Sequence, residues 1–210
     1  MKLWLPIRAE LVCLQSALRA PLLVLLLALG GVGVAAYRVP FSYTLDIGGT
    51  PGGRIYDRPF LHAGFNYVGG EPESDSPARA FRWAFEDARL VFPGVGRAVR
   101  MARLRVAAAH PGPDPVPSGW QIGPTPLAVV PLARGPRVYH LLLPAAGPDL
   151  DLRLHTPTFQ PPNDPRALGF AADAFSFRSV TPTLPAAAPL GWLAGCLVAG
   201  YLLVRRWGLP

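Results

Sequence analysis

The stretch from residue 149 to residue 155 reads Asp-Leu-Asp-Leu-Arg-Leu-His, so polar residues and leucines alternate without a break. Successive side chains of a β-strand point to opposite faces, and this period of two therefore predicts a strand with leucines in the core and polar groups in solvent. No helical period of similar strength occurs between residues 38 and 180. The middle of the chain is thus expected to be β-structure.

Further short apolar or alternating runs lie on both sides of this stretch. They comprise residues 41–47, 80–85, 88–92, 100–109, 127–132, 137–143 and 168–180. Proline and glycine separate the runs, and residues 69–78, 110–126 and 161–165 are predicted to be loops. About eight strands between such turn signals predict a mainly β fold, an antiparallel β-sandwich of the jelly-roll type.

Two uncharged stretches flank the β-region. Residues 20–37 and 185–204 contain no Asp, Glu, Lys or Arg and are rich in leucine, alanine and glycine. A helix rises about 1.5 Å per residue, so about 20 apolar residues cross a hydrocarbon core of about 30 Å. The sequence therefore predicts an N-terminal and a C-terminal transmembrane helix, with membrane lipid as a partner.

The charges beside the two stretches predict the topology. The net charge is +7, yet segment 38–180 holds 15 arginines against 12 acidic residues, whereas segments 1–19 and 205–210 together hold five basic residues and one acidic residue. Basic flanks stay on the cytoplasmic side of a membrane. We expect both termini in the cytoplasm, with an apolar stripe in 1–19 suited to an interfacial helix, and domain 38–180 outside the plasma membrane. No basic run with interleaved aromatic residues indicates a nucleic-acid partner.

A cleaved signal peptide is the alternative for the first apolar stretch. Residues 34–36, Val-Ala-Ala, have the small side chains of a cleavage site. The basic segment before the stretch has about 20 residues and the apolar run exceeds the 7–15 residues of a typical signal peptide. An uncleaved signal anchor is therefore favoured.

Small residues recur at helical spacing in both predicted spans. The candidates for close helix packing are Gly31 and Ala35 in the first span and Gly191, Gly195 and Ala199 in the second. Such residues let helix backbones approach closely in a membrane. They predict packing of one span on the other or on a partner subunit, although small residues are also common in any membrane helix.

The sequence contains no arrangement that supports catalysis. The four histidines, at positions 62, 110, 140 and 155, lack metal-ligand spacing, no serine has a nucleophile-elbow context, and no glycine-rich phosphate loop follows a strand. We predict no catalytic residue, no metal and no cofactor. A binding or scaffolding module is expected rather than an enzyme.

Such a module could bind a glycan or a partner protein. Sugar-binding sandwiches place aromatic faces against C–H groups and planar polar groups on hydroxyls. The candidate ligand-binding residues are Tyr56, Asp57, Arg82, Trp83, Trp120 and Asn163. In the alternative interpretation, Trp83 and its neighbours belong to the core and Arg82 forms a structural ion pair. Residues 164–166, Asp-Pro-Arg, are predicted to form a turn in which the arginine contacts a carboxylate.

A series of short motifs carries a family resemblance. The motifs occupy residues 46–48, 57–65, 81–83, 90–94, 156–159 and 164–169. In this order they resemble the extracytoplasmic, galactose-binding-like jelly roll between the first two spans of polytopic membrane proteins from filamentous, Chloroflexus-like bacteria. Those proteins are usually described as glycosyltransferase-like or uncharacterised.

The resemblance implies a module that contacts glycans or a partner protein. Two alternatives remain open. The chain could be the N-terminal or accessory part of a transferase that uses lipid-linked sugars, because the similar proteins continue with many more spans. It could also be a structural subunit of a membrane complex.

Overall fold

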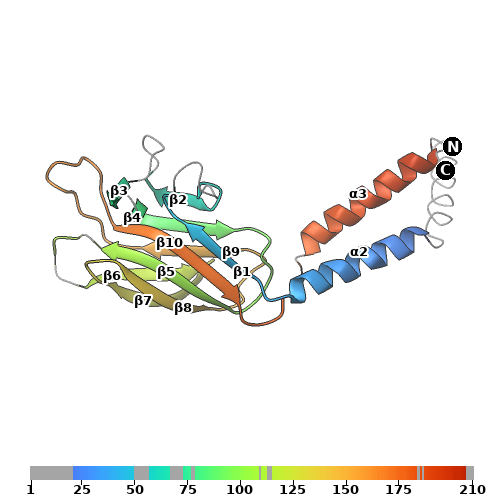
Figure 1. Cartoon of the computed structure of the whole chain (residues 1–210), viewed down its shortest axis with the longest axis horizontal. Helices are drawn as coiled ribbons and strands as arrows, with labels where there is room; N and C mark the ends of the chain where they lie inside the picture. The colour runs from blue at the N-terminus through green and yellow to red at the C-terminus, as the bar shows by residue number, and fades with distance from the viewer. Residues whose placement is uncertain are drawn as a thin grey trace, which may run out of the picture. The chain divides into compact units, whose positions relative to one another are not determined.

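The computed structural model describes residues 21–49, 57–66, 73–76, 79–108, 110–112, 115–183, 185 and 187–206. The predicted Tyr56 and segment 1–19 lie outside these residues. The chain divides into two compact units, of which Pro40–Leu184 is one, and Met1–Val39 together with Pro185–Pro210 is the other. The first unit contains the strands and the second contains two helices (Figure 1).

Ten strands form the first unit within the described residues. They are β1 (Ser42–Asp46), β2 (Leu61–Phe65), β3 (Glu73–Ser76), β4 (Arg79–Phe92), β5 (Arg100–Ala108), β6 (Val116–Ile122), β7 (Thr125–Leu132), β8 (Arg137–Leu143), β9 (Leu150–His155) and β10 (Phe170–Ser179). Their order is β7-β6-β9-β4-β10-β5-β8, with β1 beside β10 and with β2 and β3 beside β4. All these strand pairs are antiparallel. The predicted mainly β, antiparallel fold is confirmed.

The sheet folds into two layers because β4 and β10 pair at one corner and then diverge. They pair only between residues 82–84 and 170–172. Beyond the corner β4 continues beside β9, whereas β10 continues between β1 and β5 after a register shift at Ala172/Ala174. One layer is therefore β7-β6-β9-β4-β2 and the other is β1-β10-β5-β8. In Figure 1 the arrowheads of β4 and β10 lie at the same end of the domain.

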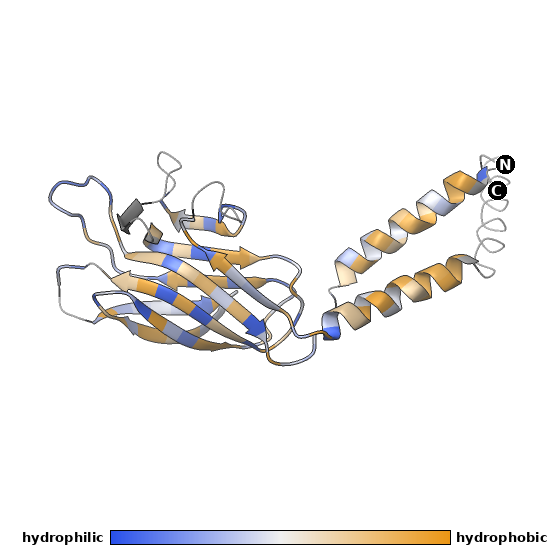
Figure 2. Cartoon of the chain, in the orientation of Figure 1, coloured by the Kyte–Doolittle hydropathy of each residue, from blue (hydrophilic) through white to orange (hydrophobic). Residues whose placement is uncertain are grey.

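Ring contacts between the layers identify the core. Phe92 of β4 stacks on Phe175 of β10 with ring centroids 5.3 Å apart. The ring of Trp120 in β6 packs edge-on against the ring of Tyr139 in β8, with the ring centroids 5.8 Å apart. The three leucines of β9 are buried in the same core, so the inward face predicted from the alternating stretch is confirmed. Figure 2 shows the corresponding alternation of hydropathy along the strands.

A buried ion pair lies at the corner between the layers. Arg82, one of the β4 residues that pair with β10, donates from Nε and Nη2 to both carboxylate oxygens of Asp57, at 2.5 and 3.1 Å. The two side chains are 4% and 2% exposed. Asp57 also accepts a hydrogen bond from the Gly48 backbone N–H at 2.8 Å. The pair thus ties β4 to the segment that follows β1.

Several strand predictions need correction. Residues 80–85 and 88–92 form one continuous strand, β4, rather than two. The predicted loop 69–78 contains β3, and the predicted loop 110–126 contains β6. Strand β2 has no counterpart among the predicted strands.

Strand β6 escapes prediction because Pro117 and Gly119 resemble turn residues. Both occupy positions between the buried residues of the strand, and therefore lie on its outer face. Strand β9 pairs with β6 only from Gly119 onward. The missing N–H of Pro117 consequently breaks no bond to β9, which is how a proline is accommodated in a sheet.

The described residues of the second unit form α2 (Pro21–Arg38) and α3 (Ala187–Arg206), both largely apolar in Figure 2. Among the described residues, α3 alone is long and apolar enough to cross a membrane, over Ala187–Val204. The apolar helical segment Leu22–Arg38 is shorter than such a span. Membrane crossing by either helix stays a prediction.

The contact between α2 and α3 does not use the predicted small residues. A Cβ atom on Gly33 would lie 3.0 Å from Cδ2 of Leu190, whereas a Cβ on Gly31, Gly191 or Gly195 would meet nothing within 4 Å. Ala35 and Ala199 are exposed. Gly33 follows Gly31 by two residues, which is about half a helical turn, and so faces the other way. Packing of the predicted residues on each other is therefore not observed, and packing on a partner subunit stays a prediction.

The substitution Asp57→Asn should destabilise the β-domain by about 3–5 kcal/mol, because it leaves the buried guanidinium of Arg82 without a counter-charge. Denaturant unfolding of the full chain in detergent, followed by tryptophan fluorescence, measures this effect. Asp46→Asn, the same change at an exposed carboxylate, should cost less than about 0.5 kcal/mol. Equal stability of the two variants would contradict the role given to the pair.

Candidate functional site

A groove with a volume of 360 Å³ lies on the outer face of the layer that contains β2, β4, β9 and β6. The residues that line the groove include Ala63, Asp87, Arg89, Gly119, Gln121, Arg153 and His155. Strand periodicity explains why polar groups collect there. The residues between the buried positions of β6 and β9 all point away from the core.

Strand pairing arranges the groove in two rows. In the first row, Asp87 of β4 is opposite His155 of β9, which is opposite Gly119 of β6. In the second row, Arg89 is opposite Arg153, which is opposite Gln121. The groove thus presents planar polar groups from three neighbouring strands.

Asp151 forms ion pairs with both arginines of the second row, and its single negative charge offsets one of their two positive charges. Like charges on directly opposite residues destabilise a sheet. Arg89 binds the Asp151 carboxylate through Nε at 2.8 Å and Nη2 at 3.1 Å, and Arg153 binds it through Nη2 at 3.0 Å. Arg89 and Arg153 remain 41% and 47% exposed, so both guanidinium groups also reach the groove.

The same contacts shift the acidity of the carboxyl. Burial raises the pKa of Asp151, but hydrogen bonds and charges from Arg89 and Arg153 outweigh this effect, so that the pKa lies below its ordinary value. The hydrogen bond with Asp151 likewise raises the pKa of Arg89. Both groups are therefore ionised at neutral pH, which fixes the geometry of the row.

The first row contains a close contact between His155 and Asp87, and leaves space above Gly119. Nδ1 of His155 lies 2.8 Å from Oδ1 of Asp87. A Cβ atom on Gly119 would approach only His155, at 3.9 Å from its carbonyl oxygen and 4.0 Å from its Cβ. The space above Gly119 is therefore large enough for a ligand atom.

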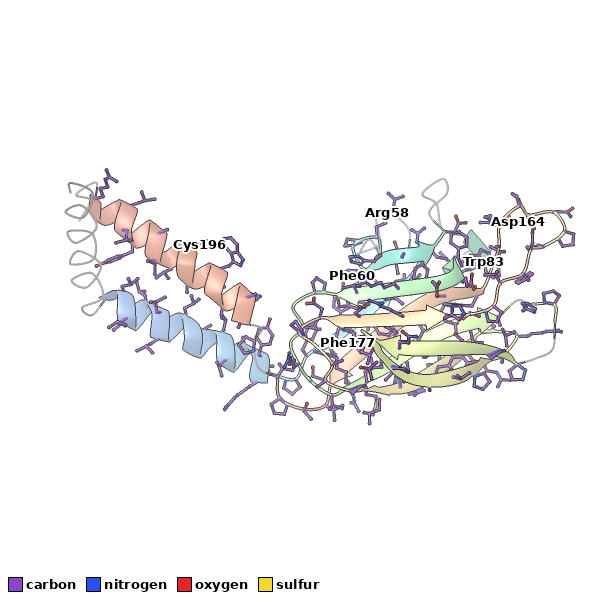
Figure 3. The ribbon with its side chains drawn as sticks, turned by 180° about the vertical axis from the view of Figure 1, so that it is seen from behind. Arg58, Phe60, Trp83, Asp164, Phe177 and Cys196 are labelled. Carbon is purple, nitrogen blue, oxygen red and sulfur yellow. The ribbon has the colours of Figure 1, made fainter. Side chains whose placement is uncertain are left out.

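Aromatic side chains continue the outer side of β4 beyond the groove. Phe81, Trp83 and Phe85 alternate with the buried residues Arg82 and Ala84 and are partly exposed. They therefore project from the same side of the strand as Asp87 and Arg89. The rings of Phe81 and Trp83 meet edge-on at 5.8 Å. Figure 3 shows Trp83 toward one end of the domain and Phe60 and Phe177 toward the other.

Three of the predicted ligand-binding residues are structural. Asp57 and Arg82 occupy each other in the buried pair, as the alternative interpretation of Arg82 predicts. Trp120 is buried in the core, and its Nε1 donates to Oγ of Ser118 at 2.8 Å. None of the three side chains reaches a surface ligand. Arg82 and Trp120 lie on the inward faces of β4 and β6, and Asp57 is buried in the segment before β2. A single stretch of sequence does not reveal which of its residues are buried in this way when its pairing is unknown.

The other three predicted residues have different outcomes. Trp83 is partly exposed beside the groove strand, and Asn163 is exposed in the connection between β9 and β10. Tyr56 lies outside the described residues. The binding roles of these three residues stay predictions.

The predicted Asp-Pro-Arg turn is confirmed. Nε of Arg166 donates to Asp164 Oδ1 at 2.8 Å, and the Arg166 backbone N–H donates to the same oxygen at 2.9 Å. These two contacts lower the pKa of Asp164 to about 2. The turn is self-contained, which fits a structural role.

Sequence reasoning misses most of the groove. Asp151, Arg153 and His155 are the outward residues of the alternating stretch, and that alternation is the signal that could identify them. Their neighbours Arg89 and Gln121 come from strands about 60 and 30 residues earlier in the chain, and only the register brings them together. No group of three or more His, Cys, Asp or Glu side chains in the described part of the chain is placed to hold a metal ion.

Comparisons with known proteins give structural likenesses only. No family model and no curated protein matches the chain. The CBM6 of LamC, a laminarinase from Zobellia galactanivorans, is similar with a TM-score of 0.38 and 11% identity, over 65% of this chain and 98% of that one. A family 35 carbohydrate-binding module from an environmental isolate is similar with a TM-score of 0.41 and 8% identity, over 69% of this chain and 98% of that one.

A third solved structure is similar to the same extent. The CBM35 of Cellvibrio japonicus Abf62 has a TM-score of 0.37 and 14% identity, over 65% of this chain and 92% of that one. At this level of similarity, the function of the present chain has to be inferred from its own residues. The resemblance to polytopic membrane proteins of Chloroflexus-like bacteria stays a prediction.

The substitution Asp151→Asn tests the charge arrangement through pH. The folded pKa of Asp151 lies below the unfolded value of about 3.9, so its stabilising contribution is complete above that pH and is lost as pH falls through the folded pKa. At pH 7 the variant should lose on the order of 1 kcal/mol, because the partners are partly exposed.

Thermal unfolding of the full chain at a series of pH values measures this effect. Between about pH 5 and pH 2 the melting temperature of the wild type should fall further than that of Asp151→Asn. The exposed-site control Asp46→Asn should follow the wild type. A parallel fall in all three proteins would rule out the charge arrangement as a source of stability.

Proposed function

We propose that this protein is a membrane-anchored, non-catalytic binding module that holds a hydroxyl-rich ligand, a glycan, in the groove of β2, β4, β9 and β6. The observation that supports this most directly is the second row of the groove, in which Arg89, Arg153 and Gln121 lie side by side on three strands. Guanidinium and amide groups are planar and offer several donors in fixed directions. Such groups suit the recognition of neighbouring hydroxyls on a sugar ring.

The surroundings of that row support the same ligand class. Asp87 and His155 add a carboxylate and an imidazole ring, and Gly119 leaves space above the sheet. Trp83 projects from the same side of β4 and offers an aromatic surface to the C–H groups of a sugar. Because the polar and aromatic parts follow one another along a strand, the proposed ligand is an extended chain rather than a single ring.

The proposed anchor is the helical unit. Helix α3 is long and apolar enough to cross a membrane, and its Trp192 and Leu193 side chains are exposed. Ser42 at the start of β1 is paired with Arg178 near the end of β10, so both connections to the helices leave the β-domain at one end. Together with the basic flanks of the sequence, this supports a plasma-membrane protein with cytoplasmic termini and an extracytoplasmic β-domain.

The substitution Gly119→Val tests the groove directly. Valine suits a strand, and its Cβ meets only ordinary contacts at 3.9–4.0 Å, so the domain should stay folded while the groove is filled. A glycan array probed with the full-length protein identifies the ligand, and calorimetric titration then gives its affinity. We expect the variant to bind at least tenfold more weakly, a loss of about 1.4 kcal/mol or more.

The matched control is Ala107→Val, which adds a similar bulk to the outer face of β5 in the other layer. It should bind as the wild type does. A folded Gly119→Val protein with unchanged affinity would place the ligand elsewhere. If the wild-type protein binds no glycan on the array, the glycan proposal fails as a whole.

The anchoring proposal has its own test. The full chain should remain in the membrane fraction after alkaline carbonate extraction, because apolar helices are solvated by lipid. An epitope inserted at Gly147, in the connection between β8 and β9, should be reached by antibody on intact spheroplasts. Release by carbonate, or labelling only after lysis, would overturn the anchor or the topology respectively.

A further inference from the structure

A second hollow, of 230 Å³, lies on the outer face of the other layer, over β1, β10 and β5. The residues that define this second hollow are Ser42, Thr44, Met101, Arg103, Ser176 and Arg178. It shares no residue with the groove. Its side chains are chemically different from those of the groove, because three are hydroxyls and two are guanidinium groups.

Strand register places these groups in a small grid. Thr44 of β1 is opposite Ser176 of β10, which is opposite Arg103 of β5. In the adjacent row Ser42 is opposite Arg178, which is opposite Met101. Hydroxyl O–H and guanidinium N–H donors therefore converge on one surface, with no carboxylate in either row.

The two arginines of the second hollow lack a counter-charge among the described residues. The contact recorded for Arg178 is with Sδ of Met101, at 3.7 Å, and no carboxylate lies within 4.0 Å of Arg103 or Arg178 in the described part of the chain. One row further along, Arg105 is paired with Asp173 at 3.3 Å. The groove arginines are likewise paired with Asp151. The arginines of the second hollow thus differ from Arg105 and from the groove arginines in having no carboxylate partner among the described residues.

Exposed apolar side chains surround the second hollow at the end where the chain leaves the β-domain. Leu142, opposite Met101 on β8, is 68% exposed, and Val180 after β10 is 54% exposed. Three residues separate the end of α2 from β1, and seven separate β10 from α3. Uncompensated cations beside exposed apolar side chains are the features of a surface that meets anionic lipid.

We propose that the second hollow binds the phosphate group of an anionic phospholipid, with Leu142 and Val180 in contact with the adjacent lipid. Arginine fits a phosphate with two parallel N–H donors, and the hydroxyls of Ser42, Thr44 and Ser176 complete the donor set. This inference rests on the proposed membrane anchor, since the anchor supplies the lipid surface. It adds a lipid class and named residues that the anchor alone does not specify.

An environment-sensitive fluorophore at position 142 tests the proposal in the full chain. The label is attached to Leu142→Cys in a background with Cys13→Ser and Cys196→Ser, and the protein is reconstituted in nanodiscs. We expect a blue shift of emission in discs that contain phosphatidylglycerol relative to discs of phosphatidylcholine alone. The shift should diminish as salt is raised, because screening weakens contacts between exposed charges.

Charge variants connect the shift to the second hollow. Arg103→Gln and Arg178→Gln should each reduce the shift, and the double variant should abolish it. Arg137→Gln, which removes an equal charge at the other end of β8, is the matched control and should keep the full shift. A double variant with an unchanged shift would overturn the proposal. Far-ultraviolet circular dichroism verifies that each variant is folded.

Two further outcomes separate the possible failures. If the protein does not enter nanodiscs, the anchoring proposal fails and the lipid site fails with it. If it enters the discs and its emission is the same in both lipids, only the lipid site is wrong. A titration of the detergent-solubilised protein with inorganic phosphate should leave the emission unchanged at millimolar concentration, and saturable binding there would identify a site for a free anion instead.

Discussion

The buried pair of Arg82 and Asp57 stabilises the corner at which β4 of one layer is hydrogen-bonded to β10 of the other. Arg82 belongs to the three residues of β4 that pair with β10, and Asp57 belongs to the segment after β1, which also contributes the N–H of Gly48. A buried charge pair is costly to separate, so the corner has one favoured geometry. From that corner β4 and β10 enter different layers, and the outer face of each layer follows from this divergence.

The two outer faces differ in electrostatic character because of the position of single carboxylates. On the β4 layer, Asp151 lies within reach of both Arg89 and Arg153, so a pair of opposed guanidinium groups is tolerated and held still. On the β10 layer, Asp173 reaches Arg105, and the rows that contain Arg103 and Arg178 have no acid. Guanidinium groups that are held by a carboxylate suit an uncharged, hydroxyl-rich ligand, whereas a pair of arginines with no carboxylate partner suits a phosphate.

The two proposals are mechanically compatible because they use different layers. The second hollow lies in the rows nearest to Ser42 and Arg178, where the chain enters and leaves the β-domain. The groove lies on β2, β4, β9 and β6 and shares no residue with it. Contact of one layer with lipid would therefore leave the ligand-binding layer in solvent, and would restrict the orientation in which a glycan reaches it.

The sequence by itself determines the strands whose alternation is unbroken and the two apolar helices, because these depend on the order of neighbouring residues. The stretch 149–155 forms β9 with its leucines inward, as predicted. Strand β6 and the groove depend on tertiary structure. Pro117 is tolerated only because β9 begins to pair two residues later, and Arg89, Arg153 and Gln121 form a row only through cross-strand register. Register is set by how the whole core packs, and no local pattern encodes it.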